Sequence, residues 1–375
     1  MKLLFLYPNA SSRSKVSVKY SGSYGKGYLF YGAEEAPQYG HTSMDHLAKS
    51  TRIEKSLFRK FFNKFLNTVI RILGGSGGDW YKLLCLRSEI GKADVIIATA
   101  DRVGIPLVVL SWLKIIPKKS TVYISIGLPE RLAKLNRLMF WFYQKAFYSC
   151  ANHIICYGYG ESLRIKSFLP NAKRRINFFP FGVGVDYFHP NGCFREKGDY
   201  ILSIGADKNR DFELLLSIAS QITSEILIIT TQQRLGELAN KFETFPDNVR
   251  FQTDVPFVEI KNLLFSSRFV VLPVIENSYS GATTTLLQAM SMEKAVIISK
   301  TSAIESGYFL QDKKNCLLVE PSDGEELLSN ILKLLDNKPN QKSLGVEARK
   351  TIKQHLSWVH YTNNLYSVID SNQEI

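Results

Sequence analysis

Residues 267–299 carry the pattern that restricts the fold most strongly. A β-branched apolar run at 269–274 is followed by a polar loop at 276–281, a helical pattern at 283–292 and a second β-branched run at 295–298. Strand, loop, helix and strand in this order predict a βαβ unit, in which the two strands are parallel. The segment therefore predicts an α/β fold.

The loop and the start of the predicted helix have the residue types of an anion site. Gly281 allows a ligand to approach the backbone closely, because glycine has no Cβ. The first N–H groups of a helix have no intrahelical partner, and Thr283, Thr284 and Thr285 add hydroxyl donors beside them. Gln288 lies one turn after Thr284, near the same edge of the helix. The alternative is an ordinary crossover whose threonines only cap the helix.

A family resemblance rests on the same residues. SGATTTLLQAM at 280–290, followed by AVIIS at 295–299, resembles the donor-site signature of the family 4 retaining glycosyltransferases, which have the GT-B fold. That family has two glutamates at the positions of Ser280 and Gln288, so its Glu-x7-Glu motif is degenerate here. The resemblance implies that Ser280 and Gly281 contact the donor sugar and that Gln288 holds the ribose hydroxyls.

The resemblance also implies a division into domains. Residues 176–190 resemble the interdomain hinge of the family, with an apolar strand that ends in a Pro/Gly turn. We therefore expect two doubly wound Rossmann-like domains that face a central cleft. They comprise an N-terminal acceptor-binding domain at 1–188 and a C-terminal nucleotide-sugar-binding domain at 189–350. A final helix at 351–375 is expected to cross back to the first domain.

A basic pair follows the first strand of the second domain, which ends at Gly205. In the family such a pair neutralises the donor diphosphate, and Lys208 and Arg210 stand nearest to that position. Departure of a nucleoside diphosphate builds negative charge, which a cation and helix-end N–H groups stabilise. The alternative is a solvated pair at the start of a helix. The predicted catalytic residues are Lys208, Arg210 and Ser280, and the predicted donor-binding residues are Gly205, Ser280, Gly281, Thr283, Thr284 and Gln288.

The sequence contains no evident metal-binding Asp-x-Asp motif, and GT-B enzymes generally need no metal. We expect no cofactor beyond the donor substrate, a UDP- or GDP-sugar. A glycine- and tyrosine-rich segment after the first strand suits a loop that wraps a ligand, which makes Gly22, Gly25 and His41 candidate acceptor-side residues. A lone loop histidine is alternatively a solvated surface group.

Positive charge is concentrated in the first half of the chain. Residues 1–190 hold 28 Lys and Arg against 11 Asp and Glu, whereas residues 191–375 hold 19 against 23. The first half therefore faces something anionic: nucleic acid, an anionic membrane or a phosphorylated substrate. No nucleic-acid-binding motif is present, so no nucleic-acid partner is expected.

Residues 51–73 read as one basic amphipathic helix that is rich in phenylalanine. Such a helix can lie in a membrane interface, and we expect it to contact an anionic membrane surface. Alternatively, it packs its phenylalanines on the N-terminal sheet and leaves a solvated basic face, because both have the same period. The predicted apolar face comprises Ile53, Leu57, Phe58, Phe61, Phe62, Phe65, Leu66, Val69 and Leu73, mostly opposite Arg52, Lys55, Arg59, Lys60, Lys64 and Arg71.

Five cysteines without metal-ligand spacing indicate buried thiols in a reducing compartment. With no secretory signal and no run of about 18 apolar residues, we expect a cytoplasmic protein that is peripheral on the inner face of the membrane.

The predicted function is a retaining hexosyltransferase that moves a sugar from a nucleotide-sugar to a lipid-linked or cell-surface glycan acceptor. The alternative is an inactive GT-B protein that acts as a membrane-associated partner or scaffold.

Overall fold

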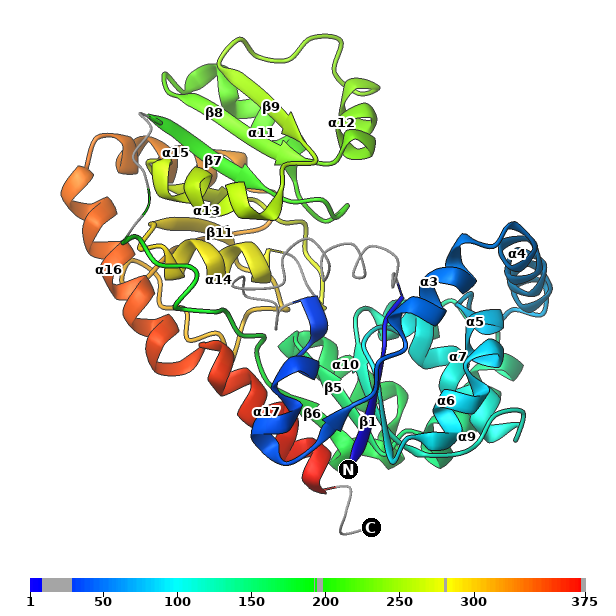
Figure 1. The fold of residues 1–375 in the computed structure, drawn as a ribbon. Helices are drawn as coiled ribbons and strands as arrows, with labels where there is room; N and C mark the ends of the chain where they lie inside the picture. Colours follow the sequence, from blue (N-terminus) through cyan, green and yellow to red (C-terminus); the bar gives the residue numbers. More distant parts are fainter. Residues whose placement is uncertain (9–28, 192, 194–197, 280–281, 372–375) are drawn as a thin grey trace. The chain divides into compact units, whose positions relative to one another are not determined.

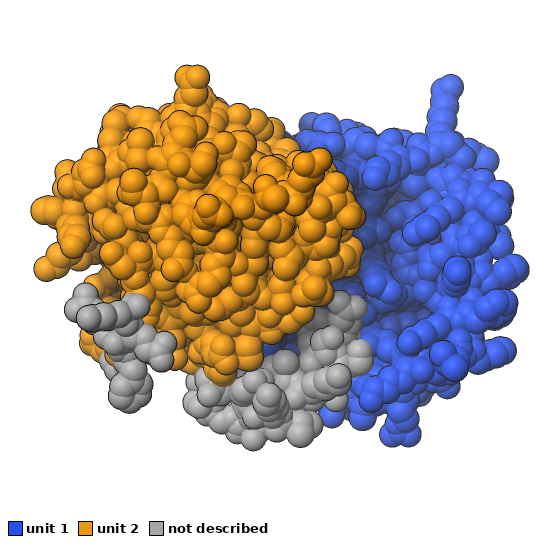
Figure 2. All heavy atoms as spheres, turned by 90° about the horizontal axis from the view of Figure 1, so that it is seen from above, with its two compact units in different colours: residues 1–179, 361–375 blue, residues 180–360 orange. Residues whose placement is uncertain are grey.

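The chain folds into two compact units, each built on a parallel sheet covered by helices. Unit 1 comprises Met1–Phe179 and Tyr361–Ile375, and unit 2 comprises Pro180–His360 (Figures 1 and 2). Two doubly wound α/β units confirm the fold class predicted from the sequence. The computed structural model describes residues 1–8, 29–191, 193, 198–279 and 282–371.

The six-stranded sheet of unit 1 has the order β2-β1-β3-β4-β5-β6, and each neighbouring pair is parallel. Its inner strands β1, β3, β4 and β5 are short, mainly apolar runs that are buried on both faces, as a sheet covered by helices on both sides requires. The strands are β1 (Lys2–Leu6), β2 (Thr42–Ser43), β3 (Val95–Ala98), β4 (Ser120–Ser125), β5 (His153–Cys156) and β6 (Ile176–Phe178).

The helices of unit 1 pack against this sheet and form the hydrophobic core with it. Helix α7, which connects β3 to β4 along the chain, is almost wholly buried. They are η1 (Ala33–Tyr39), α3 (Leu47–Lys55), α4 (Leu57–Ile72), α5 (Trp80–Cys85), α6 (Arg87–Lys92), α7 (Asp101–Trp112), α8 (Leu128–Leu132), α9 (Arg137–Cys150), α10 (Tyr159–Phe168) and η2 (Pro170–Arg175).

The six-stranded sheet of unit 2 has the order β12-β11-β10-β7-β8-β9 and is also parallel throughout. The predicted βαβ unit is its centre, where β10 and β11 pair in register from Val270 and Val296. The strands are β7 (Tyr200–Ile204), β8 (Glu225–Thr230), β9 (Val249–Thr253), β10 (Val270–Leu272), β11 (Val296–Ser299) and β12 (Leu317–Val319).

The helices of unit 2 enclose a second, separate core. The last helix of the chain begins at the end of unit 2 and continues into unit 1, because Tyr361 and the residues after it pack with unit 1. The helices are α11 (Phe212–Ile218), η3 (Ala219–Gln221), α12 (Gln232–Ala239), α13 (Phe257–Ser266), α14 (Thr283–Ser291), α15 (Gly324–Leu335), α16 (Lys338–His355) and α17 (Trp358–Asp370).

The units divide at Phe179 and Pro180, whereas the sequence placed the boundary at 188/189. Side-chain packing explains the difference. The Phe181 ring packs edge-on against Trp358, with the ring centroids 5.6 Å apart. The hydroxyl of Ser291 donates to the carbonyl oxygen of Phe188 at 2.6 Å. These contacts tie residues 180–188 to unit 2.

The predicted single helix at 51–73 is wrong, because the chain turns at Ser56 and forms α3 and α4. Ser56 has extended backbone angles, with φ −69° and ψ 121°. On one continuous helix Ile53 would share an edge with Lys60 and Lys64. The break allows Ile53 of α3 to enter the core, where it is 4% exposed.

Helix α4 lies at the periphery of unit 1 and buries no residue fully (Figure 1). Two asparagines fix which face points inward. Asn67 donates to the carbonyl oxygen of Gly78 at 2.9 Å and accepts from its N–H at 2.7 Å. Asn63 donates to the same carbonyl at 3.2 Å and accepts from the N–H of Tyr81 at 3.1 Å. The face of α4 next to Asn63 therefore packs on the protein, together with Phe62 against the Tyr81 ring.

The remaining apolar face of α4 points to solvent. Phe58, Phe61 and Phe65 are 69%, 71% and 55% exposed. The alternative in which these phenylalanines pack on the sheet is therefore wrong for these three rings. We call the apolar residues of α4 that are more than half exposed the apolar stripe, which comprises Leu57, Phe58, Phe61, Phe65 and Ile72.

In the part of the chain that the structure describes, no helix has the length and hydropathy needed to span a bilayer.

Candidate functional site

The candidate site of unit 2 lies at the point where the chain stops adding strands on one side of the sheet and starts adding them on the other. From β7 the chain crosses to β8 on one side, whereas β10 is the neighbour of β7 on the other side and leads on to β11. The loops after β7 and β10 diverge at this point, and ligands of open α/β sheets bind in the crevice outside such strand ends. The loops are joined by backbone hydrogen bonds from Asp211 N to Pro273 O and from Ile275 N to Asn209 O, both 2.9 Å.

Arg210 lies inside this crevice and not on the surface, with 4% of its area exposed. Its Nη2 donates to the hydroxyl of Thr285 at 3.3 Å. Its Nε lies 3.6 Å from a carboxylate oxygen of Asp207, which is itself about half exposed. Among residues with described positions, Nε and Nη1 have no hydrogen-bond partner. A buried guanidinium with two free donor groups is a prepared site for an anion.

The position of Arg210 depends on Gly205 at the end of β7. A Cβ at Gly205 would lie 2.1 Å from Arg210 Nε, so only glycine leaves room for the guanidinium. Burial lowers the pKa of Arg210 to about 10, and Asp207 opposes the shift. The side chain is therefore cationic at neutral pH even though it is buried.

Helix α14 brings its N-terminus to the same crevice. Its N-cap residue, Ala282, has no side chain to accept from the first N–H groups, which leaves them available to a ligand. Thr283 and Thr285 are buried, Thr284 is half-buried, and Gln288 lies buried one turn later. Because Thr285 bonds to Arg210, the cation and the helix N-terminus form one site.

The predicted basic pair is divided by the fold. Lys208 is exposed in the turn after β7, whereas Arg210 points inward. The two side chains belong to the same turn but have opposite environments, so Arg210 is the stronger candidate for contact with an anion. Two other predicted residues, Ser280 and Gly281, lie outside the described residues.

Sequence reasoning named Thr285 only as a hydroxyl donor, and it missed Asn209 and Tyr279, which organise the loops. Thr285 holds the Arg210 guanidinium, and Asn209 donates to the Tyr279 hydroxyl at 2.8 Å. Thr285 carried a signal, because it belongs to the threonine run at the helix start. Asn209 and Tyr279 carried none, since they meet only after the loops of β7 and β10 have been brought together.

The acceptor-side candidates of unit 1 have different outcomes. Gly22 and Gly25 lie outside the described residues. His41 is buried, with its Nε2 2.9 Å from a carboxylate oxygen of Asp370 and its ring stacked on Tyr366 at a centroid distance of 5.7 Å. It is therefore not the solvated loop histidine of the alternative reading, since it joins η1 and β2 to α17. A role toward an acceptor stays a prediction.

Two buried carboxyl groups lie at the carboxyl ends of β3 and β4 in unit 1. Glu161 accepts from the Ser125 hydroxyl at 2.6 Å and from the Gly127 N–H at 2.7 Å. Asp101 accepts from the Tyr123 hydroxyl at 2.6 Å. Burial raises the pKa of Glu161 to about 8, with a further contribution from the Asp101 carboxylate, and burial raises the pKa of Asp101 to about 6.

The pKa of Glu161 predicts a specific pH dependence of stability. The folded protein keeps a proton on Glu161 up to about pH 8, whereas the unfolded chain loses it near 4.5. The free energy of unfolding should therefore fall as the pH rises through this window, by at most about 1.4 kcal/mol per pH unit. Glu161→Gln cannot ionise and should flatten this fall, which makes the variant more stable at pH 8 by on the order of 2 kcal/mol.

Urea denaturation of the wild type and Glu161→Gln across this pH range measures the effect. Glu325→Gln, which changes an exposed glutamate on α15, is the control and should keep the wild-type slope. An unchanged slope in Glu161→Gln would show that the buried carboxyl does not hold its proton.

Among side chains that the structure places, no group of three or more His, Cys, Asp or Glu is arranged to hold a metal ion.

Comparison with known proteins gives a match in unit 2. The family model described as glycosyl transferases group 1 matches residues 198–337, which include Arg210 and α14. An uncharacterised glycosyltransferase of Methanocaldococcus jannaschii is 26% identical over 132 residues. That alignment covers 34% of this chain and only 31% of the relative. Residues 198–337 are therefore similar to the group 1 glycosyl transferases.

Solved structures match over the whole chain. Sucrose-phosphate synthase from Thermosynechococcus elongatus has a TM-score of 0.72 and 13% identity, covering 100% of this chain and 99% of that one. HepE from Anabaena, solved in complex with UDP-glucose, has a TM-score of 0.66 and 13% identity, covering 99% and 100%. At this identity the likeness concerns the fold, and it confirms the predicted GT-B architecture.

Proposed function

We propose that this chain is a group 1 type glycosyltransferase, which binds a nucleotide-sugar on unit 2 and transfers the sugar to a lipid-linked or cell-surface glycan acceptor. The observation that carries the donor site is Arg210, a buried cation with free donor groups at the N-terminus of α14. A diphosphate satisfies both features at once, because its oxygens accept from the guanidinium and from the first N–H groups of the helix.

The arrangement of the crevice suggests how the donor lies in it. Its diphosphate would contact Arg210 and the first turn of α14, with Lys208 reaching in from the solvent side. Its ribose would lie near Gln288, one turn further along the helix. The family resemblance alone places the sugar near Ser280 and Gly281. A UDP- or GDP-sugar is the proposed donor, and the UDP-glucose complex of HepE is consistent with this choice.

The proposed chemistry follows from charge development at the leaving group. As the bond between the sugar and the diphosphate breaks, negative charge grows on the phosphate oxygens. Arg210 and the N–H groups of α14 stabilise that charge in a buried environment, where such interactions are strong. We further propose that the configuration of the sugar is retained, with the leaving diphosphate helping to remove the proton of the acceptor hydroxyl. No separate protein base or metal ion is required by this scheme.

We also propose a location at the inner face of a membrane. The support is the exposed stripe of α4, with the basic residues of the same helix beside it. Aromatic and apolar side chains enter the bilayer interface, while Lys and Arg side chains interact with anionic lipid headgroups.

Thermal-shift measurements against UDP-, GDP-, ADP- and dTDP-sugars test the donor proposal. A ligand that binds only the folded protein raises its melting temperature by mass action. We expect one nucleotide class to raise the melting temperature. Gln288→Leu should lower the affinity for that ligand by roughly threefold to tenfold, because a hydrogen bond to the ribose is lost.

The matched control is Gln221→Leu, which removes an exposed glutamine in η3, before β8. It should bind the donor as the wild type does. If none of the four nucleotide classes shifts a well-folded sample, the proposed donor site is wrong, and the inactive GT-B alternative is favoured.

A further inference from the structure

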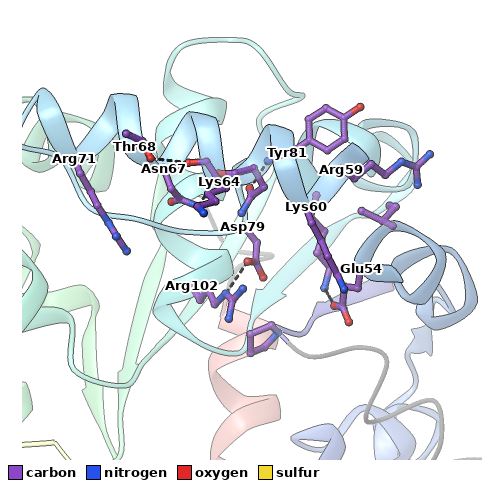
Figure 3. Close-up of a pocket in the computed structure, with 14 residues that line it drawn as sticks. Glu54, Arg59, Lys60, Lys64, Asn67, Thr68, Arg71, Asp79, Tyr81 and Arg102 are labelled. Atoms are coloured by element: carbon purple, nitrogen blue, oxygen red, sulfur yellow. Dashed lines mark hydrogen bonds and ion pairs between the residues drawn. The ribbon is translucent and has the colours of Figure 1, made fainter. Parts of the chain in front are cut away.

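Unit 1 contains a basic pocket at its own topological switch point. It has a volume of about 470 Å³ and lies among Pro8 after β1, Arg102 in the first turn of α7 after β3, and the side chains of α4 (Figure 3). In the sheet order β2-β1-β3, the connections after β1 and β3 diverge, so this is the position where an α/β sheet binds a ligand. The volume is in the range of small-molecule sites.

The pocket has far more positive than negative charge. Six of its fourteen lining residues are Lys or Arg and two are acidic. Both carboxylates already have partners: Glu54 accepts from Lys82 Nζ at 2.6 Å, and Asp79 accepts from Arg102 Nε at 2.6 Å. Lys82 also donates to the Tyr7 carbonyl oxygen at 2.6 Å. These two ion pairs neutralise the charge at the base of the pocket. The positive charge on its α4 side is left without nearby negative charge.

Four cations on α4 supply this unbalanced charge. Figure 3 shows Lys60 and Arg71 extending from α4 to the side where Glu54, Asp79 and Arg102 lie. Within the described parts of the chain, none of the four α4 cations has a carboxylate within ion-pair distance. Like charges around one cavity repel each other, and a polyvalent anion relieves the repulsion. The four are Arg59, Lys60, Lys64 and Arg71.

Phosphate is the anion that fits this set of donors. Arginine binds phosphate oxygens with two parallel N–H groups, and lysine adds a mobile point charge. The cations lie along one edge of a helix that is fixed by Asn63 and Asn67, with Lys64 and Arg71 two turns apart, so they form a row and not a single point. A row of cations suits a phosphate monoester or a diphosphate better than a singly charged carboxylate.

The surroundings of the pocket indicate a lipid as the bearer of this phosphate. The apolar stripe lies on the next face of α4, with Leu57 and Ile72 81% and 80% exposed. Beyond the stripe, an apolar cavity of about 370 Å³ opens between α4, α5, α7 and α9, lined in part by Leu66, Ile70 and Leu73 of α4. One helix thus borders a basic pocket, an exposed apolar surface and an apolar cavity, and this combination matches the chemistry of a phospholipid or a lipid phosphate.

We propose that the basic pocket of unit 1 binds the phosphate or diphosphate group of a lipid whose chain lies in the bilayer contacted by the apolar stripe. That this lipid is the acceptor of the sugar rests on the proposed function, whereas the binding itself does not. The acceptor is then a phosphate-bearing lipid, and Lys60, Lys64 and Arg71 recognise its phosphate.

Vesicle binding by the full chain tests the proposal. Phosphatidylcholine vesicles carry either phosphatidic acid, which has a terminal phosphate monoester, or phosphatidylglycerol, which has a phosphodiester, at equal surface charge. We expect the wild type to prefer phosphatidic acid by about tenfold, since the pocket gains charge-assisted hydrogen bonds to the exposed monoester. Lys64→Ala with Arg71→Ala should remove this preference.

The matched control is Arg52→Ala with Lys55→Ala. It removes the same two charges from the neighbouring helix α3, at exposed positions that do not line the pocket. It should lower binding to both vesicles equally and keep the preference for phosphatidic acid. If the wild type shows no preference, or if both double variants lose it equally, general surface charge explains the binding and the proposed lipid site is wrong.

A soluble probe distinguishes a lipid headgroup from a free phosphorylated molecule. Inorganic pyrophosphate is titrated into Arg210→Met, so that the site of unit 2 does not contribute. Pyrophosphate binding that Lys64→Ala with Arg71→Ala abolishes, together with no vesicle preference, would assign the pocket to a soluble ligand and overturn the lipid proposal. The pocket variants should keep nucleotide binding, so failure of the pocket is separable from failure of the donor site.

Discussion

Arg210→Met is expected to weaken binding of the nucleotide-sugar by at least about a hundredfold and to lower kcat/KM by about a thousandfold. Removal of one preorganised donor to a developing negative charge typically lowers rates by two to three powers of ten. Arg210 is buried and supplies two free N–H groups as well as a full charge, so water cannot replace it. Calorimetric titration with the donor and initial-rate kinetics measure the two effects.

The same substitution should leave the fold intact or make it more stable. Methionine fills most of the space of the arginine, and a buried cation without a full partner destabilises the folded state. The Asp207 carboxylate is about half exposed, so losing its partner has little effect. A higher free energy of unfolding together with a lower affinity for the nucleotide-sugar would identify Arg210 as a functional residue and not a structural one.

Lys208→Met is the control for Arg210→Met. It removes the same charge from the same turn, but from an exposed position, and we expect less than about a tenfold loss of affinity because exposed charges are screened by solvent. If Arg210→Met binds the donor as well as Lys208→Met does, the buried guanidinium is not the diphosphate site.

Replacing Phe58, Phe61 and Phe65 together by serine is expected to reduce vesicle binding by at least about a thousandfold. Transfer of a phenylalanine from water to an apolar environment contributes about 1.5–3 kcal/mol, so three rings contribute more than about 4 kcal/mol. The rings are more than half exposed in the folded protein. Their loss should therefore change the free energy of unfolding by less than about 0.5 kcal/mol each.

Flotation with vesicles that contain anionic lipid measures this effect, and a salt series separates its two parts. Contact through the basic residues should weaken as salt is added, whereas contact through the stripe should not. The control replaces three exposed apolar residues away from α4 by serine: Leu163, Val346 and Val359. Should the stripe variant float as well as this control, the membrane surface lies elsewhere.

Much of the fold could be predicted because its signals are local. Short β-branched runs alternate with helical patterns, and this alternation specifies parallel sheets without any knowledge of contacts. The strands predicted at 269–274 and 295–298 correspond to β10 (Val270–Leu272) and β11 (Val296–Ser299), and their ends differ by one or two residues. Arg210, Thr283 and Gln288 of the candidate site could also be named from the sequence, since these residues follow strand ends in the sequence.

The direction in which side chains point was not accessible from the sequence. Lys208 and Arg210 are two residues apart and chemically similar, and only the approach of the loop after β10 and of Thr285 decides that Arg210 is buried. His41 is likewise placed by Asp370, at the opposite end of the chain. Such contacts join distant segments, and no periodicity records them.

Helix α4 shows most clearly that the direction of side chains could not be predicted from the sequence. Its hydrophobic period indicated one apolar face, and such a face can pack on a core or lie on a membrane. The sequence by itself determined an amphipathic, basic, phenylalanine-rich segment. Only the tertiary structure decided that Asn63 and Asn67 bond to the Gly78 and Tyr81 backbone and turn three phenylalanines outward. The physical reason is that a buried backbone N–H or C=O needs a partner, and this need outweighed the burial of apolar rings at the periphery of unit 1.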